Sequence, residues 1–409
     1  MASFGGVDLG SGGAAVFEVT SNSDDEEFVY PLPDGSVAVI PAASRYIVVR
    51  QCPGATFDEV HENAREAANR AIDVYFGQGG RPLVVAHKDS TYMVGWISSA
   101  GQTLRIVGRN QLSMRFRAHG EVRDADGNLV VQPAPPPKVW HESSRYYRVS
   151  ESSTDLYDSF RNLYLAIEAL LSDVVPPTTK PNGNLEGDSE WLERALRFVG
   201  QTVDLSLYAP QSPKAPHNAI HDELYANLRT AIFHAKTGRA TWTPQDWSSR
   251  EMIVAARLRY ARMFRALASE YLDIGYPAGG FTMAFWQSTW EAMLGDQEVF
   301  VSNDPTKIEN EPTGDYQLAP SGGDFLKLPT VPADDMAADW RRGVLGIEAA
   351  STVHQSLGEV RRFGTLRGGE PAMIESLHAP LVVDGLVELQ VVLLVEGRNY
   401  GQPRQDFES

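Results

Sequence analysis

Two residues in the middle of the chain, Arg229 and His234, are of the types that break phosphodiester bonds without a metal. A histidine with the ordinary pKa of about 6.5 can accept or donate a proton near neutral pH. An arginine can hold phosphate oxygens and offset the negative charge that grows in a transition state. The pair would suit RNA cleavage, although a histidine near a helix end often only complements the helix dipole.

The stretch from Leu224 to Lys236 predicts the helix that carries this pair. Its apolar residues recur at spacings of three and four and form one buried stripe: Leu224, Leu228, Ala231 and Ile232. On an unbroken helix, side chains five positions apart point about 140° apart. Arg229 and His234 could therefore meet only if the helix loosens before Gly238, if the arginine curls around, or if a second copy of the chain contributes its own pair.

Three further segments predict helices that would pack with this one. They run from a cap at 152–155 to Pro176, from Glu190 to Val199, and from the Ser248 cap to Tyr271. Each carries an apolar stripe, and four such helices can bury a core of their own. Glu168 lies on the first of them, where it could orient Arg229 or His234, or pair with a neighbouring arginine at the surface.

Arginines without neighbouring acids mark the last of these helices. Between Glu251 and Glu270 it carries no acid but has four arginines, Arg257, Arg259, Arg262 and Arg265. Together with Lys236 they could follow an RNA backbone, or they could simply form a solvated helix face. The net charge of −17 argues against broad, non-specific binding of nucleic acid.

The run YYRVSESSTDLYDSFRNLYLAIEALLSD from Tyr146, the motif LRTAIFHAKTGR and the long helix after it resemble the HEPN superfamily. More narrowly, residues 146–275 resemble bacterial ApeA-like and MauJ-like members. The resemblance implies a dimeric helical bundle that cleaves RNA without metal or cofactor. In it, the histidine of the motif, here His234, helps to activate a ribose 2′-hydroxyl, and the arginine, here Arg229, steadies the phosphate. The family commonly has Asn after the arginine, where this chain has Thr230.

The resemblance leaves two functions open. One is a metal-independent HEPN endoribonuclease acting in stress or anti-phage defence. The other is a non-catalytic HEPN-fold interaction or sensor protein, because many family members serve only as binding modules. The implied partners are RNA, a second copy joined through the bundle, and possible protein targets.

The flanks of the bundle predict an α+β multidomain protein. Residues 1–140 would form a mixed α/β domain, with strands at 14–20, 36–40 and 45–51 and one helix that begins at a Thr56–Glu59 capping box. The proline-rich segment 132–138 predicts a joint to the HEPN-like helical bundle at 141–275. The C-terminal region, 276–409, would be loop-rich, with a helix at 335–347 and a β-hairpin at Asp384-Gly385.

The remaining signals concern location and metals. The single cysteine, Cys52, excludes an internal disulfide and is typical of a reducing cytoplasm. No run of about 18 apolar residues predicts a membrane span, and the glycine-rich start of the chain predicts a flexible N-terminus. His217 and His221 have a spacing that can chelate a metal, but no third ligand accompanies them, so no metal site is expected.

Overall fold

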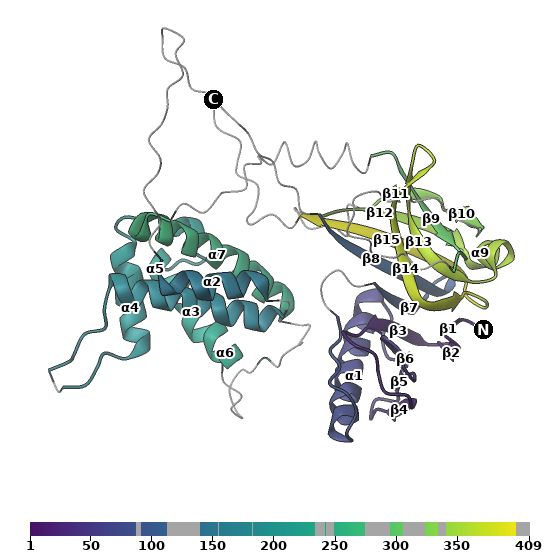
Figure 1. Ribbon diagram of the computed structural model, residues 1–409, viewed down its shortest axis with the longest axis horizontal. Coiled ribbons are helices and arrows are strands. Elements are labelled where there is room, and N and C mark those ends of the chain that lie inside the picture. Colours follow the sequence, from purple (N-terminus) through teal and green to yellow (C-terminus); the bar gives the residue numbers. More distant parts are fainter. Residues whose placement is uncertain are drawn as a thin grey trace, which may run out of the picture. The chain divides into compact units, whose positions relative to one another are not determined.

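The computed structural model describes residues 1–86, 91–112, 140–153, 155–181, 183–233, 242, 249–274, 295–305, 324–333 and 341–397. These residues form two compact units (Figure 1). The sheet unit takes its described residues from 1–113 and 281–398, and the helical unit takes its described residues from 114–280. The helical unit is therefore an insertion between two halves of the sheet unit.

A nine-stranded sheet forms the centre of the sheet unit, with the order β11-β12-β15-β8-β7-β3-β6-β5-β4. Its strands are β3 (Gly13–Glu18), β4 (Phe28–Pro31), β5 (Val37–Ile40), β6 (Tyr46–Cys52), β7 (Tyr92–Ser98), β8 (Gly101–Leu112), β11 (Thr330–Pro332), β12 (Arg341–Ala349) and β15 (Glu388–Gly397). Neighbouring strands are antiparallel except β15 and β8, which are parallel and pair from Glu388–Thr103 to Gly397–Leu112. Strands from both ends of the chain thus meet in the middle of one sheet.

An antiparallel six-stranded sheet with the order β10-β9-β13-β14-β1-β2 packs against the first. Its strands are β1 (Ser3–Phe4), β2 (Val7–Asp8), β9 (Gln297–Ser302), β10 (Phe325–Lys327), β13 (Val360–Arg367) and β14 (Glu370–Val382). The core between the sheets contains Phe4, Ile106, Val301, Phe363 and Leu393. The sheets approach so closely that a Cβ at Gly108 would lie 2.7 Å from the Phe363 ring, which leaves room only for glycine.

Helix α1 (Phe57–Gly77) covers the other face of the nine-stranded sheet over β3, β5, β6 and β7 (Figure 1). The predicted Thr56 cap is confirmed, because the Glu59 N–H donates to Thr56 Oγ1 at 3.3 Å, while the Glu59 carboxylate accepts at 2.8 Å from the N–H of Ala55, one residue before the cap. The sheet unit therefore has three layers, with a short helix, α9 (Ala350–Leu357), packed into the core between the sheets.

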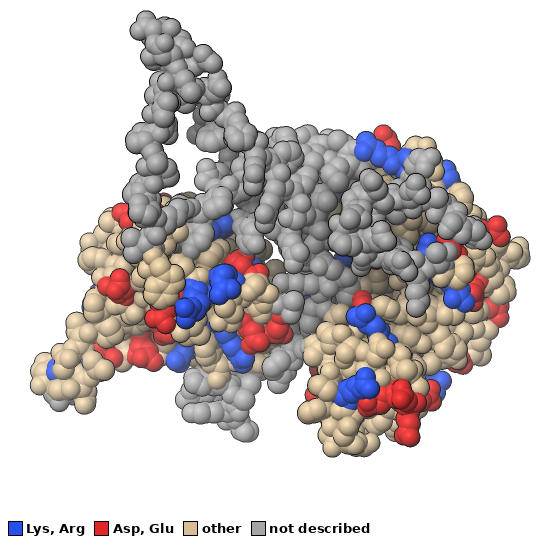
Figure 2. All heavy atoms as spheres, viewed as in Figure 1, with Lys and Arg blue, Asp and Glu red and all other residues tan. Residues whose placement is uncertain are grey.

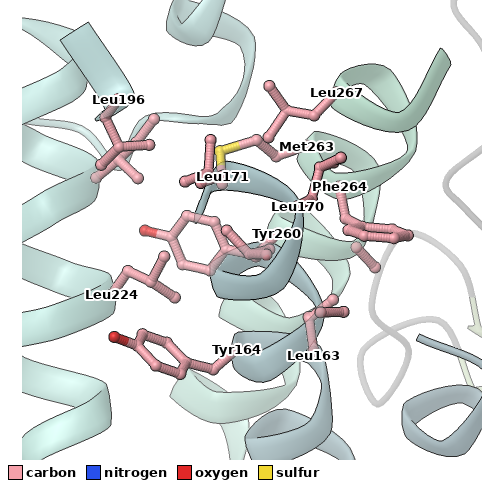
Figure 3. Close-up of a cluster of buried hydrophobic side chains, with 14 of the residues drawn as sticks. Leu163, Tyr164, Leu170, Leu171, Leu196, Leu224, Tyr260, Met263, Phe264 and Leu267 are labelled. Carbon is pink, nitrogen blue, oxygen red and sulfur yellow. The ribbon is translucent and has the colours of Figure 1, made fainter. Parts of the chain in front are cut away.

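The helical unit has its own hydrophobic core. Its helices are α2 (Glu142–Ser152), α3 (Leu156–Val174), α4 (Asp188–Val199), a 3-10 turn (Leu205–Tyr208), α5 (Pro216–His221), a π-helix (Asp222–Arg229), α6 (Thr230–Phe233) and α7 (Arg250–Leu272). Figure 3 shows side chains of α3, α4, α7 and the π-helix meeting in this core: Leu163, Leu170, Leu196, Leu224, Tyr260 and Phe264. The core is made only from residues of the insertion.

The predicted fold class is wrong. Two large β-sheets make the chain a sheet-rich α+β protein and not a helical-bundle protein of HEPN type. The predicted C-terminal region is also not a separate part, because β12 and β15 extend the sheet that the N-terminal strands begin. Local patterns could not show this, because the pairing joins segments almost three hundred residues apart along the chain.

Three local predictions on the flanks are also wrong. Asp384 and Gly385 form a turn, with Gly385 at a φ of 84°, but β14 and β15 on its two sides join different sheets and make no hairpin. Residues 341–347, predicted as the end of a helix, belong to β12 because they pair with β15. The N-terminus is ordered, since β1 pairs with β14 and buries Phe4. The proline-rich joint at 132–138 lies outside the described residues.

Candidate functional site

Arg229 is the last residue of the π-helix, Asp222–Arg229. A π-helix has a wider turn than an α-helix and is uncommon, and such segments occur frequently at functional sites. The sequence pattern predicts a regular helix here, so the structure differs from the expectation. The apolar stripe is preserved, because Leu224 and Leu228 remain buried. The wider turn changes which of the polar and aromatic side chains lie together.

Four side chains spaced by four residues line up along this helix, and we call them the aromatic column: His221, Tyr225, Arg229 and Phe233. The rings of His221 and Tyr225 stack, with centroids 5.6 Å apart and planes inclined by 17°. The Arg229 guanidinium carbon lies 4.9 Å from the Tyr225 ring centroid and 5.9 Å from that of Phe233. Contacts of this kind orient the guanidinium.

Two consecutive residues at the start of α4 contact the column. Asp188 Oδ2 lies 3.7 Å from Arg229 Nη2, and Ser189 Oγ lies 2.9 Å from His221 Nε2. The side chain of Asp188 is 66% exposed and that of Arg229 is 22% exposed. A long ion pair that reaches solvent contributes little stability, so Asp188 leaves Arg229 able to exchange partners.

Glu168 on α3 belongs to the same neighbourhood. The Tyr164 hydroxyl donates to Glu168 Oε1 at a long 3.4 Å. Burial, followed by the charge of Asp188, raises the pKa of Glu168 above its usual range, whereas Arg229 and the Tyr164 hydrogen bond lower it. The structure therefore brings Glu168 within electrostatic reach of Arg229, from a helix that is separate in sequence.

His234 and Lys236 lie outside the described residues, which end at Phe233 and resume at Trp242. Trp242 is half-buried against the core, and its backbone N–H donates to the Ala231 carbonyl at 3.0 Å. Trp242 is thus held next to α6.

The four arginines of α7 are half-buried, and two of them have clear partners in the helical unit. Arg257 pairs with Glu151 at 3.0 Å and donates to Ser159 Oγ. Arg259 pairs with Glu223 of the π-helix at 2.5 Å. These two arginines point to different helices and so do not extend one strip. Arg262 and Arg265 also have interactions.

In Figure 2, basic and acidic side chains lie side by side on the face shown, with no broad field of either sign among the described residues.

Sequence reasoning treated His221 only as half of a possible metal pair with His217. In the structure its Nε2 atom faces Ser189. Within the part of the chain that the structure describes, no group of three or more His, Cys, Asp or Glu side chains is arranged to hold a metal ion. The signal for the column was present in the sequence as Tyr225, four residues after His221 and four before Arg229.

Comparison with protein-family models gave no match for this chain, and neither the curated proteins nor the solved structures gave one. The resemblance of residues 146–275 to HEPN proteins therefore stays a prediction. Among the described residues, no helix combines the length and the apolarity that a bilayer span requires.

Proposed function

We propose that the chain is a metal-independent endoribonuclease in which Arg229 holds the scissile phosphate and His234 transfers a proton. The observation that carries the proposal is the placement of Arg229. Its guanidinium lies on the Tyr225 and Phe233 rings beside the carboxylate of Asp188, and it is still partly open to solvent. An arginine oriented in this way can donate hydrogen bonds to phosphate oxygens in place of a surface carboxylate.

The reaction needs two proton transfers. A base removes the proton of a ribose 2′-hydroxyl, the resulting oxygen attacks phosphorus, and the bond from phosphorus to the 5′-oxygen breaks. An acid then gives that 5′-oxygen a proton, so that a 2′,3′-cyclic phosphate and a 5′-hydroxyl are formed. The aromatic column supplies an imidazole at His221 besides the one at His234. One histidine can act as base and the other as acid, while Arg229 offsets the charge on the phosphate.

A second function, non-catalytic binding, is favoured by a different observation. Arg229, Arg257 and Arg259 each have a carboxylate partner within the helical unit. Cations that are already paired can serve the stability of the unit, which would then act as a docking or sensing module. The exposure of Asp188 favours the first function, because an ion pair as long and as exposed as Asp188–Arg229 contributes little to stability.

The test measures cleavage of labelled single-stranded RNA in EDTA. We expect the wild type to cleave and His234→Ala and Arg229→Ala to lose about a hundredfold or more in rate. Matched controls are His217→Ala and Arg197→Ala, which replace the same residue types in the same unit; Arg197 pairs with Glu193 at the surface. A substrate with a single 2′-deoxyribose at the cleaved position should resist. Equal activity in the wild type and in His234→Ala, or none in either, would leave the docking module as the function.

A further inference from the structure

A second group of positive charges lies in the sheet unit, on the face of the nine-stranded sheet that α1 partly covers. Arg105 and Arg109 are four residues apart on β8, so they project from the same face of the sheet. Val107 between them packs into the core under α1, which fixes that face. We call these two residues the β8 arginine pair. Among the residues that the structure describes, each lies against aromatic side chains rather than in an ion pair with an acid.

Arg105 is held between two rings. Its guanidinium carbon is 4.6 Å from the Phe57 ring centroid and 5.2 Å from the Trp96 ring centroid. Its Nε donates to Gln390 Oε1 at 2.7 Å, which fixes the plane of the group from one side. Burial lowers the pKa of Arg105. The charges of Asp58 and Glu388 act in the other direction and raise it, but neither carboxylate lies within ion-pair distance of the guanidinium. Its two terminal nitrogens form no ion pair with any residue that the structure describes.

Arg109 has even fewer partners. Its guanidinium carbon lies 5.6 Å from the Tyr92 ring centroid, and its Nε is buried with no hydrogen-bond partner among the described residues. A desolvated guanidinium without an anion is costly. Although the chain has a net charge of −17, no carboxylate among the described residues pairs with Arg109.

One residue of α1, Arg65, adds to the positive potential, and a second, His61, is a neutral ring beside it. Burial and the charges of Arg65 and Arg109 lower the pKa of His61 to about 3, so this ring is neutral and the nearby charges are those of the arginines. The Arg65 guanidinium lies over the Phe17 ring at 5.6 Å. The face therefore alternates cations and rings, and its half-buried members are Phe57, Trp96, Arg105 and Arg109.

We propose that the β8 arginine pair binds the phosphate of a nucleotide, with the base stacked against Phe57 or Trp96. A guanidinium held by its Nε presents two parallel N–H groups to a phosphate. Aromatic rings beside a cation accept any base, because stacking requires only a flat π-face. The nucleotide is either free or part of a single strand, since both offer the same phosphate and base. This site does not rest on the ribonuclease proposal.

The test is calorimetric titration of the full chain with ADP, inorganic pyrophosphate, adenosine and a short single-stranded DNA, which the 2′-hydroxyl mechanism cannot cleave. We expect ADP or the DNA to bind, adenosine not to bind, and pyrophosphate to bind more weakly than ADP. Arg109→Gln and Arg105→Gln should each raise the Kd about tenfold or more, as expected for the loss of a charged hydrogen bond. Preference for the DNA over ADP would identify a single strand as the ligand, and the reverse a free nucleotide.

The matched control is Arg70→Gln, which removes an exposed arginine of α1 that pairs with Glu66 at 2.8 Å. It should leave the Kd unchanged. Arg109→Lys keeps the charge and loses the fork, so it should bind more weakly than the wild type even if Arg109→Gln is unstable. The proposal is overturned if no probe binds the wild type at millimolar concentration. It is also overturned if the Arg105 and Arg109 variants bind as Arg70→Gln does.

Discussion

Glu223 accepts hydrogen bonds from Arg259 Nη1, at 2.5 Å, and from the Tyr260 hydroxyl through the same Oε2 atom. Glu223 is the second residue of the π-helix, and its two donors are consecutive residues of α7. Tyr260 is fully buried, and burial, followed by the charge of Glu223, raises the pKa of its hydroxyl. The contact therefore fixes the start of the eight-residue π-helix, which ends at Arg229, to the long helix α7.

Replacing Glu223 should destabilise the helical unit and loosen the π-helix. Glu223→Leu leaves the Tyr260 hydroxyl and the Arg259 guanidinium without their acceptor, which we expect to cost about 2 kcal/mol. The pair is partly exposed, at 27% and 19%, so the cost stays below that of a fully buried pair. Urea unfolding measures the loss, and hydrogen exchange of residues 224–229 measures the loosening. Glu193→Leu, which breaks an exposed pair on α4, should cost less than about 0.5 kcal/mol. Equal costs would contradict a special role for Glu223.

Mixing two inactive variants tests whether a second copy completes the site. If Arg229 of one copy works with His234 of the other, a mixture of Arg229→Ala and His234→Ala should recover about a quarter of the wild-type cleavage rate. Half of the dimers would be mixed, and one of their two sites would be intact. Each variant alone should stay inactive. If both residues act within one copy, the mixture will be as inactive as its components, and the dimer loses its catalytic role.

Acid should weaken the sheet unit through His61. This buried ring lies between Phe57 and Tyr92 and has a pKa of about 3 in the folded protein, against an ordinary 6.5. The unfolded chain therefore binds this proton first, and stability falls as the pH drops below 6.5 towards 3. His61→Phe keeps a ring and removes the proton site. Between pH 7 and 4.5 the wild type should lose on the order of 2 kcal/mol more than the variant. Urea unfolding at both pH values measures this difference, and parallel losses would rule out His61 as the cause.

Glu168 should act in the opposite direction in the helical unit. Its pKa is raised by burial and by Asp188, so the folded protein binds this proton more tightly than the unfolded chain does. Its contribution to stability is therefore present at low pH and is lost as the pH rises through the raised pKa. Glu168→Gln should raise the thermal midpoint at pH 7 and leave it nearly unchanged at pH 3.5. A midpoint that falls at pH 7 would mean that the Arg229 charge outweighs the burial of the carboxylate.

Local sequence signals correctly predicted the helices and strands that are determined by caps, turns and apolar spacing within a few residues. The Thr56 cap and the apolar spacing after it located α1, and turn residues separated β3, β5 and β6 correctly. The cap at Asp155 and the prolines at 176 and 177 bounded α3. Cys52 is buried, and burial raises the pKa of its thiol to about 12. In each case the deciding interactions lie within a few residues or on one helix face.

Long-range pairing was not accessible in the same way. The run Val391–Val395 is apolar on both sides because alternate residues enter different cores, Val391 and Leu393 between the sheets and Val392 and Leu394 towards α1. Such a run indicates a central strand, but not that β8 is its neighbour. The same limit holds for the candidate site: residues close in the chain could be predicted, and contacts between distant segments could not. Arg229 was found from its type and motif, whereas Asp188 and Ser189 reach the column through a fold that no spacing reveals.

The parallel pairing of β8 with β15 has a consequence for biosynthesis. When β8 has left the ribosome, its neighbour is still untranslated, and the whole helical unit is made in between. That unit has a core of its own and can fold while the edge of β8 that later pairs with β15 is still unpaired. A nascent chain that stalls before residue 388 would therefore display unpaired backbone from the middle of its largest sheet, which is a template for aggregation and a surface for chaperones to cover.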